Sequence, residues 1–332
     1  MKRVWGPLPA LGMAARESDD GFRTGKSWTL EERVLRTARI AEGRGFCFHH
    51  EDLAGLLLGG PEEPDAVRRA ALREQRLNLV DGFVAVRGRE VLVEHSRLRR
   101  NGGPTVVREC EAVAAEFARR LVADCPLVEC VALAGSHATG AGLPGDDVDV
   151  NLFCGDGAKF IAYSLALYHA SRFGLTASAR STAAERVGPL PKVVCVNVVF
   201  ERSQTAPFAR RDDQLAYELL ISRPVFGADR LREVLESNGW LTSLFPQIAE
   251  RREALITDGG SSYPPTAIGR SMASLNGSRS VLNALGFWLA SAAHSAVDIT
   301  RRGDPVTAGR VRQLRRMKYP YDVLDKVEDG KW

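Results

Sequence analysis

The 332-residue chain has no apolar run of the eighteen or so residues that a transmembrane helix needs. It begins Met-Lys-Arg, but the apolar core of a signal peptide does not follow. Its six cysteines form no C-x-x-C motif and no Cys/His spacing typical of zinc. They are Cys47, Cys110, Cys125, Cys130, Cys154 and Cys195. We therefore expect a soluble, cytoplasmic protein with no membrane partner, whose cysteines are buried free thiols.

A strong excess of charge of either sign is also missing. The chain carries 45 Lys and Arg against 41 Asp and Glu, a net charge of +4, and the acidic residues are interspersed among the basic ones. This balance permits an acidic substrate without indicating a nucleic-acid footprint. With 332 residues, the chain is long enough for two or three domains, each with its own core.

The most informative stretch is Val131–Phe153, which reads VALAGSHATGAGLPGDDVDVNLF. An apolar strand ends at a glycine-rich turn, and a second strand then carries Asp147 and Asp149 among valines. Side chains two apart on a strand point the same way, so the two carboxylates project together. Because two adjacent anions repel, this pattern predicts a divalent cation between them, with Mg²⁺ the first candidate and Mn²⁺ an alternative.

The turn predicts the second half of a nucleotide site. Gly135 allows the backbone to approach a ligand, and Ser136 adds a hydroxyl where successive N–H groups can hold phosphate oxygens. Asp146 would face away from Asp147 if the strand had already begun, so it is interpreted as a turn residue.

This combination resembles the nucleotidyltransferase superfamily of polymerase-β type. The resemblance implies that Gly135 and Ser136 bind the β- and γ-phosphates of an NTP, and that Asp147 and Asp149 hold the bridging metal. It also implies the reaction, transfer of an NMP group to an acceptor with release of pyrophosphate.

A narrower likeness, from about Leu30 to Pro246, is to bacterial nucleotidyltransferase-domain proteins that begin with a winged-helix segment. It rests on four stretches of the chain: Cys195-Val196-Asn197, Asp212 to Leu219, Val225 to Ala228, and Asn238-Gly239-Trp240.

We accordingly predict an α+β fold with four parts. They are a flexible tail (1–27), a winged helix-turn-helix (28–100), a mixed-sheet nucleotidyltransferase core (104–225) and a helical C-terminal domain (226–332). In the second part, the pattern predicts helices from Leu30, over His50–Leu58 and from Pro64 to about Asn78. A hairpin of Phe83–Val86 and Val91–Val93 should follow, with its turn at Arg87-Gly88-Arg89.

The third predicted helix carries four arginines, which could bind DNA or form an ordinary charged surface; the second interpretation is preferred. They are Arg68, Arg69, Arg73 and Arg76.

The apolar strand Lys192–Phe200 departs from the superfamily pattern. Where a third carboxylate usually accepts the proton of the attacking group, this strand has Asn197, which cannot act as a base. Glu201 is the first candidate to replace it, and Asp212 is another. Otherwise the small-molecule acceptor should be ionised already, as a carboxylate, phosphate or phosphonate is. Lys192 is a candidate phosphate ligand.

Two other functions stay open. The chain could be a non-catalytic nucleotide sensor that uses the winged helix to bind DNA or protein, or it could nucleotidylate a protein or a tRNA.

Overall fold

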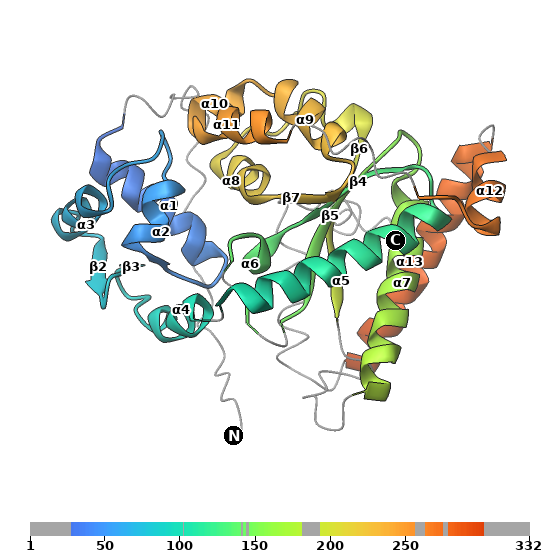
Figure 1. The fold of residues 1–332 in the computed structure, drawn as a ribbon, viewed down its shortest axis with the longest axis horizontal. Helices are drawn as coiled ribbons and strands as arrows, with labels where there is room; N and C mark the ends of the chain where they lie inside the picture. Colours follow the sequence, from blue (N-terminus) through green and yellow to red (C-terminus); the bar gives the residue numbers. More distant parts are fainter. Residues whose placement is uncertain are drawn as a thin grey trace.

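The computed structural model describes residues 28–101, 103–140, 142–143, 146–180, 193–255, 263–274 and 278–301. In these residues the chain is an α+β protein with thirteen α-helices and two β-sheets (Figure 1). None of the described helices is long and apolar enough to cross a membrane. The predicted tail, Lys192 and the end of the predicted C-terminal domain, 302–332, lie outside the described residues.

The N-terminal unit combines helices with a small antiparallel sheet. Its elements are α1 (Leu30–Gly43), β1 (Phe48–His49), α2 (His50–Gly55), α3 (Pro64–Arg73), β2 (Leu77–Val80), β3 (Phe83–Val86) and α4 (Leu92–Arg100). The strand order is β1-β3-β2. Thr29 and Glu32 form a capping box at the start of α1, since each side chain accepts a hydrogen bond from the backbone N–H of the other residue.

The hairpin lies one strand earlier in the chain than the sequence predicted. Helix α3 ends at Arg73, and Leu77–Val80 pairs with Phe83–Val86. The turn is Asp81-Gly82, where both residues have positive φ, 49° and 81°. Asp-Gly suits a two-residue hairpin turn whose twist matches the strands. Val91 and Val93 therefore do not form a strand; they lie at the start of α4.

A mixed four-stranded sheet occupies the centre of the molecule. Its elements are α5 (Gly103–Asp124), β4 (Val128–Leu133), α6 (Gly135–Ala138), β5 (Val148–Cys154), α7 (Lys159–Arg180), β6 (Val194–Glu201), the 3₁₀-helix η2 (Arg202–Gln204), α8 (Asp213–Ile221) and β7 (Arg223–Phe226). The strand order is β6-β5-β4-β7, with β5 parallel to β6 and the other pairs antiparallel. Helices α5 and α7 pack on the sheet and against each other.

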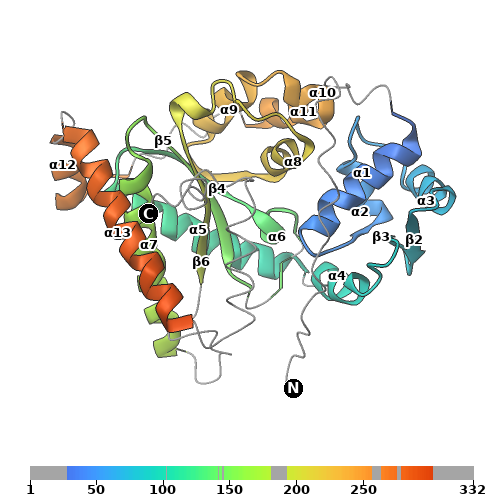
Figure 2. The ribbon, with the colours of Figure 1, turned by 180° about the vertical axis from the view of Figure 1, so that it is seen from behind.

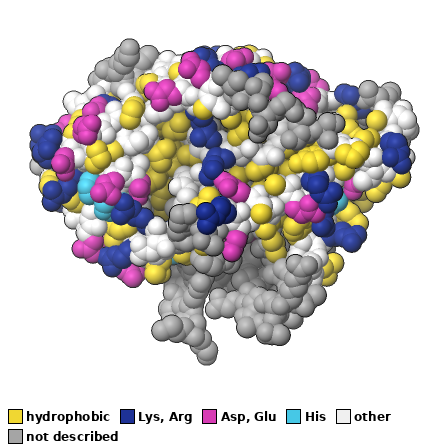
Figure 3. Space-filling view, in the orientation of Figure 1, with side chains coloured by type: hydrophobic (Ala, Val, Ile, Leu, Met, Phe, Trp, Pro, Cys, Tyr) yellow, Lys and Arg dark blue, Asp and Glu magenta, His cyan; other side chains and the backbone are white. Residues whose placement is uncertain are grey.

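The remaining described helices surround this sheet. They are α9 (Ala228–Glu236), α10 (Trp240–Leu244), α11 (Gln247–Ala254), α12 (Ala267–Ser274) and α13 (Arg279–Arg301). Helices α10 and α11 contact α8, whereas α12 packs on α5 and α13 on α7 (Figure 2). Hydrophobic side chains gather on the side of α12 and α13 in Figure 3. The exposed ones on α13 are Val281, Leu285, Trp288 and Leu289.

The N-terminal unit shares a continuous buried cluster with the rest of the chain. Val34 and Leu53 belong to the same cluster as Val150 and Phe245. The predicted boundary near residue 100 thus lies between two sheets that share one hydrophobic core. The division into domains stays a prediction.

Candidate metal and nucleotide site

In the turn after β4, the backbone of Gly135 lies against the Asp149 carboxylate. The Ala134 N–H donates a hydrogen bond to the backbone oxygen of Asp149 (2.8 Å), which fixes the two strands at this point. Gly135 has a φ of 63°, and a Cβ at this position would lie 2.3 Å from Asp149 Oδ2. Only glycine satisfies both constraints, because any other residue would be strained and would displace the Asp149 side chain. Gly135 and Ser136 are half-buried and so within reach of a ligand.

Asp147 and Asp149 converge as the alternation predicts, and a cysteine joins them. Oxygens of the two carboxylates and the Cys195 sulfur all lie within 4.8 Å of one another. Cys195 is the residue of β6 that pairs with Asp149, and it is half-buried rather than buried as the sequence suggested. Asn197 lies next to it, with its Oδ1 3.9 Å from Cys195 Sγ. The residue opposite Asp149 is therefore Cys195, two positions before the expected Asn197.

A β-bulge removes Glu201 from this site. Val150 pairs with Val196 but Asn151 pairs with Val198, so Asn197 is an extra residue in β6. One extra residue reverses the face on which every later side chain lies. Glu201 pairs with Cys154, on the opposite face from Asp149 and at the far end of β5.

Glu201 has a local role there. Its carboxylate accepts a hydrogen bond from the Lys159 N–H (3.2 Å), and its own N–H donates to Gln204 Oε1 (2.9 Å). The expectation that Glu201 replaces the missing base is wrong, because the strand does not keep its alternation.

The Asp212 side chain also makes its contacts outside the site. It caps α8 by accepting a hydrogen bond from the Leu215 N–H (2.9 Å), and it forms an ion pair with Arg210. Neither acidic candidate from the third strand or its following helix supplies a base to the site.

The loop before Asp147 is held by Asp146. Asp146 Oδ2 accepts hydrogen bonds from the Leu143 N–H (3.1 Å) and from Arg99 of α4 (2.8 Å). This confirms Asp146 as a turn residue. Arg99 thereby ties the N-terminal unit to the loop that leads into Asp147 and β5.

His137 lies fully buried in α6, one residue after Ser136. Its Nε2 is 3.7 Å from Cys110 Sγ, and Gly142 leaves room for its ring, since a Cβ on Gly142 would lie 1.8 Å from Nδ1. Burial lowers the pKa of His137, and Asp146 opposes that effect only in part. A neutral imidazole therefore packs behind the turn.

Asn151 continues the polar face of β5 into the interior. Its side chain is fully buried and donates to Glu218 Oε1 of α8 (2.8 Å). Glu218 in turn receives a hydrogen bond from Arg44 at the end of α1 (2.7 Å). Arg44 also stacks on the Tyr217 ring, 4.8 Å from its centroid. This network joins the sheet to the N-terminal unit just beyond the site.

The donor set at the site favours a hard cation with incomplete protein ligation. Carboxylate oxygens are the ligands that Mg²⁺ and Mn²⁺ prefer, and Asp147 and Asp149 supply them. The Cys195 thiol is a soft ligand that does not suit Mg²⁺. Two carboxylates with open positions are typical of a magnesium site that also takes phosphate oxygens from a substrate.

No family model, no curated protein and no solved structure matches this chain.

Proposed function

We propose that this chain is a Mg²⁺-dependent nucleotidyltransferase that moves an NMP group from an NTP to an acceptor and releases pyrophosphate. The observation that carries this proposal is the convergence of the Asp147 and Asp149 carboxylates, with Asp149 lying against Gly135 at a turn between two paired strands. A metal held there would neutralise the triphosphate and orient it. Gly135 and Ser136 would bind the terminal phosphates.

The arrangement of elements supports the two finer fold assignments. The order helix, strand, helix, helix, hairpin with sheet order β1-β3-β2 is what a winged helix requires. The helix-strand-turn-strand order from α5 to β5 is what the nucleotidyltransferase core requires.

Strand β6 brings the Cys195 thiol rather than a third carboxylate to the cluster, which restricts the chemical class of the acceptor. Among the described residues, no third carboxylate joins the cluster of Asp147, Asp149 and Cys195. Without a base, an alcohol would be a poor nucleophile, whereas a carboxylate, phosphate or phosphonate oxygen is already ionised at neutral pH. The acceptor oxygen would form a bond to the α-phosphorus as the bond to pyrophosphate breaks, and no proton need be removed. We propose a small acid as the acceptor.

Calorimetric titration of each NTP, with and without Mg²⁺, tests the proposal. One NTP should bind with Mg²⁺, and Asp147→Ala should weaken binding by a factor of at least about one hundred because a metal ligand is lost. Asp81→Asn is the control, since that carboxylate lies in the exposed turn between β2 and β3 and pairs with Arg97, and it should retain affinity within a few-fold. No binding of any NTP, or equal loss in the two variants, would contradict the proposal.

The second candidate is a nucleotide sensor that binds DNA. The same missing third carboxylate favours it, together with Arg68 and Arg69, which are exposed on α3. Against it, Arg73 pairs with Glu31, and Arg76 lies beyond the end of α3 and pairs with Glu74, so two of the four arginines are neutralised. Salt-dependent binding of duplex DNA that is lost on Arg68→Ala and Arg69→Ala, without NTP turnover, would favour the sensor.

A further inference from the structure

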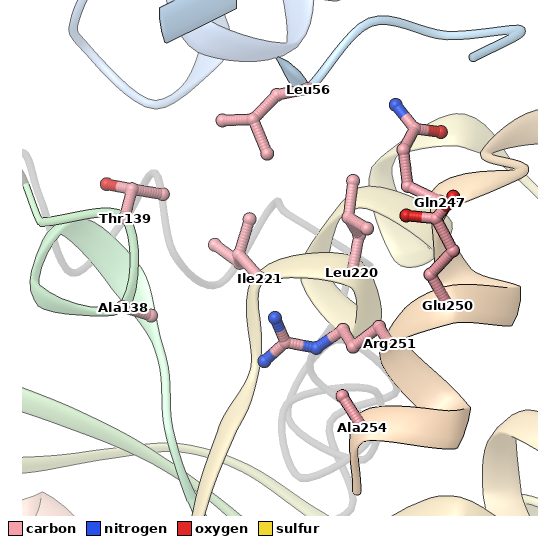
Figure 4. A pocket seen from close by; sticks show the side chains of 9 residues that line it. All are labelled: Leu56, Ala138, Thr139, Leu220, Ile221, Gln247, Glu250, Arg251 and Ala254. Atoms are coloured by element: carbon pink, nitrogen blue, oxygen red, sulfur yellow. The ribbon is translucent and has the colours of Figure 1, made fainter. Parts of the chain in front are cut away.

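A cavity of about 480 Å³ lies where the N-terminal unit meets the C-terminal helices (Figure 4). Leu56 borders it from the end of α2, Ala138 and Thr139 from α6, and Ile221 from α8. Helix α11 supplies the opposite wall (Figure 4). A volume of this size suits a small organic molecule rather than a macromolecule.

The cavity contains an arginine whose charge no described residue neutralises. Arg251 donates one hydrogen bond, to the backbone oxygen of Ser222, and its Nε is buried without a partner among the described residues. It forms no ion pair with any described carboxylate. Burial, with repulsion from Arg223, lowers the pKa of Arg251 to about 10. A half-buried cation with a desolvated nitrogen of this kind is stabilised when an anion pairs with it.

A second buried polar atom borders the same space. The Gln247 amide nitrogen donates to the backbone oxygens of Gly55 (3.1 Å) and Leu57 (2.9 Å). These two bonds fix the orientation of the amide, so Oε1 is available only as an acceptor. That oxygen is buried and has no donor among the described residues. Glu250 adds an exposed carboxylate at the rim.

The rest of the lining is apolar except for Thr139, whose hydroxyl donates to the backbone oxygen of Ser136. Leu220 and Ile221 are 4% exposed and lie beside Arg251 in Figure 4. Leu56 faces them across the cavity. An occupant that satisfies the whole surface must combine an anion, a hydrogen-bond donor and a short hydrocarbon portion.

We infer that this cavity is a second small-molecule site, which binds an organic acid that also carries an N–H or O–H group, such as an amino acid or a hydroxy acid. The acid group would pair with Arg251, the donor with Gln247 Oε1, and the hydrocarbon with Leu56 and Ile221. The site is separate from the carboxylate site, which attracts cations. Helix α6 lies between them, because Gly135 contacts Asp149 while Ala138 and Thr139 line the cavity.

The test needs neither NTP nor Mg²⁺, so its failure is distinguishable from failure of the proposed function. The twenty α-amino acids and their α-hydroxy acid counterparts would be screened one at a time, in EDTA, by thermal unfolding and then calorimetry. At least one should raise the Tm of the wild-type protein. The Arg251→Gln substitution should weaken its binding by a factor of about ten or more, since a charge-assisted hydrogen bond is lost.

Arg252→Gln is the matched control, because the adjacent Arg252 does not line this cavity; it should bind like the wild type. If Arg251→Gln does not fold, Ala254→Phe supplies the same comparison, since Ala254 is exposed at the cavity edge and a phenyl group there should block entry.

Three probes define the class of ligand. For the best acid, the amide analogue lacks the anion, the unsubstituted carboxylic acid lacks the donor, and inorganic phosphate lacks the hydrocarbon. Each should bind at least about tenfold more weakly. A phosphate response equal to that of the acid would overturn the assigned class. The absence of any stabilising acid, or an equal response of the Arg251→Gln and Arg252→Gln variants, would overturn the site itself.

Discussion

Asp149 and Asn151 lie two residues apart on one face of β5, yet their surroundings differ in kind. Asn151 is fully buried and bonded to Glu218, whose charge Arg44 balances. Asp149 is half-buried beside a second acid, Asp147, at a turn that only glycine can form. In the first group a carboxylate lies against a cation, whereas in the second two carboxylates and a thiol converge within the distance at which they could share a metal ion. The kind of neighbour thus separates a structural network from a candidate site on the same strand.

The same comparison applies to two half-buried arginines. Arg44 reaches the Glu218 carboxylate at 2.7 Å and stacks on Tyr217, whereas Arg251 reaches only a backbone oxygen among the described residues. The first holds two parts of the fold together. The second borders a cavity, so its charge is available to a ligand.

The largest effect should come from breaking the balanced network. Arg44→Leu leaves the Glu218 carboxylate, 4% exposed, without its cation, and should lower the free energy of unfolding by about 3 kcal/mol. Urea denaturation measures the loss. Arg97→Leu is the control, because its partners Asp81 and Glu94 are largely exposed, and should cost less than about 1 kcal/mol. Similar losses in both variants would show that the network is not structural.

A pair of glycines tests the carboxylate site. Gly135→Ala and Gly140→Ala both place a side chain at positive φ, 63° and 77°, so each should cost about 1 to 3 kcal/mol of stability. A Cβ on Gly140 meets nothing within 4 Å, whereas one on Gly135 meets the Asp149 carboxylate. Only Gly135→Ala should therefore weaken Mg²⁺-NTP binding, by about tenfold or more, as measured by calorimetry. Equal NTP affinities in the two variants would argue against a ligand role for Asp149.

A smaller gain is expected from restoring a third carboxylate. Because Cys195 pairs with Asp149, Cys195→Asp should tighten Mg²⁺ binding several-fold by supplying a third oxygen ligand. Asn197→Asp lies at the bulge and should have less effect. Metal titration by calorimetry ranks the two variants. A larger gain from Asn197→Asp would mean that position 197, as the sequence suggested, and not position 195 is the place for a third metal ligand.

The sequence predicted the part of the site that local geometry determines. Alternation along one strand is enough to place Asp147 and Asp149 together, and the Gly135-Ser136 turn follows from the end of the preceding strand. The α+β class and most helices also follow from local periodicity.

What the sequence could not predict depends on pairing between distant segments. The bulge at Asn197 exists only in the register of β6 on β5, and it alone moves Glu201 to the other face. The sequence did contain a signal for Cys195, since it lies two residues before Asn197 and side chains two apart on a strand point the same way. The hairpin was misplaced although Asp81-Gly82 is a strong turn sequence, because the helical period before it was extended too far. Arg251 has no local signal, since Leu56 and Ala138 border its cavity from distant parts of the chain.

The weakest expected effect concerns pH and two buried histidines, His137 and His169. Burial lowers the pKa of His137, behind the turn, and of His169, which contacts Asp124 at 3.0 Å, below the ordinary value of 6.5. The unfolded chain therefore binds more protons than the folded protein once the pH falls through about 6.5. Stability should be constant above that pH and should decrease below it. Urea unfolding from pH 8 to 5 measures this loss, and His137→Asn should show a shallower decrease than the wild type. If stability rose on acidification, these imidazoles would gain a proton on folding. The His137 ring behind Ser136 would then be charged rather than neutral.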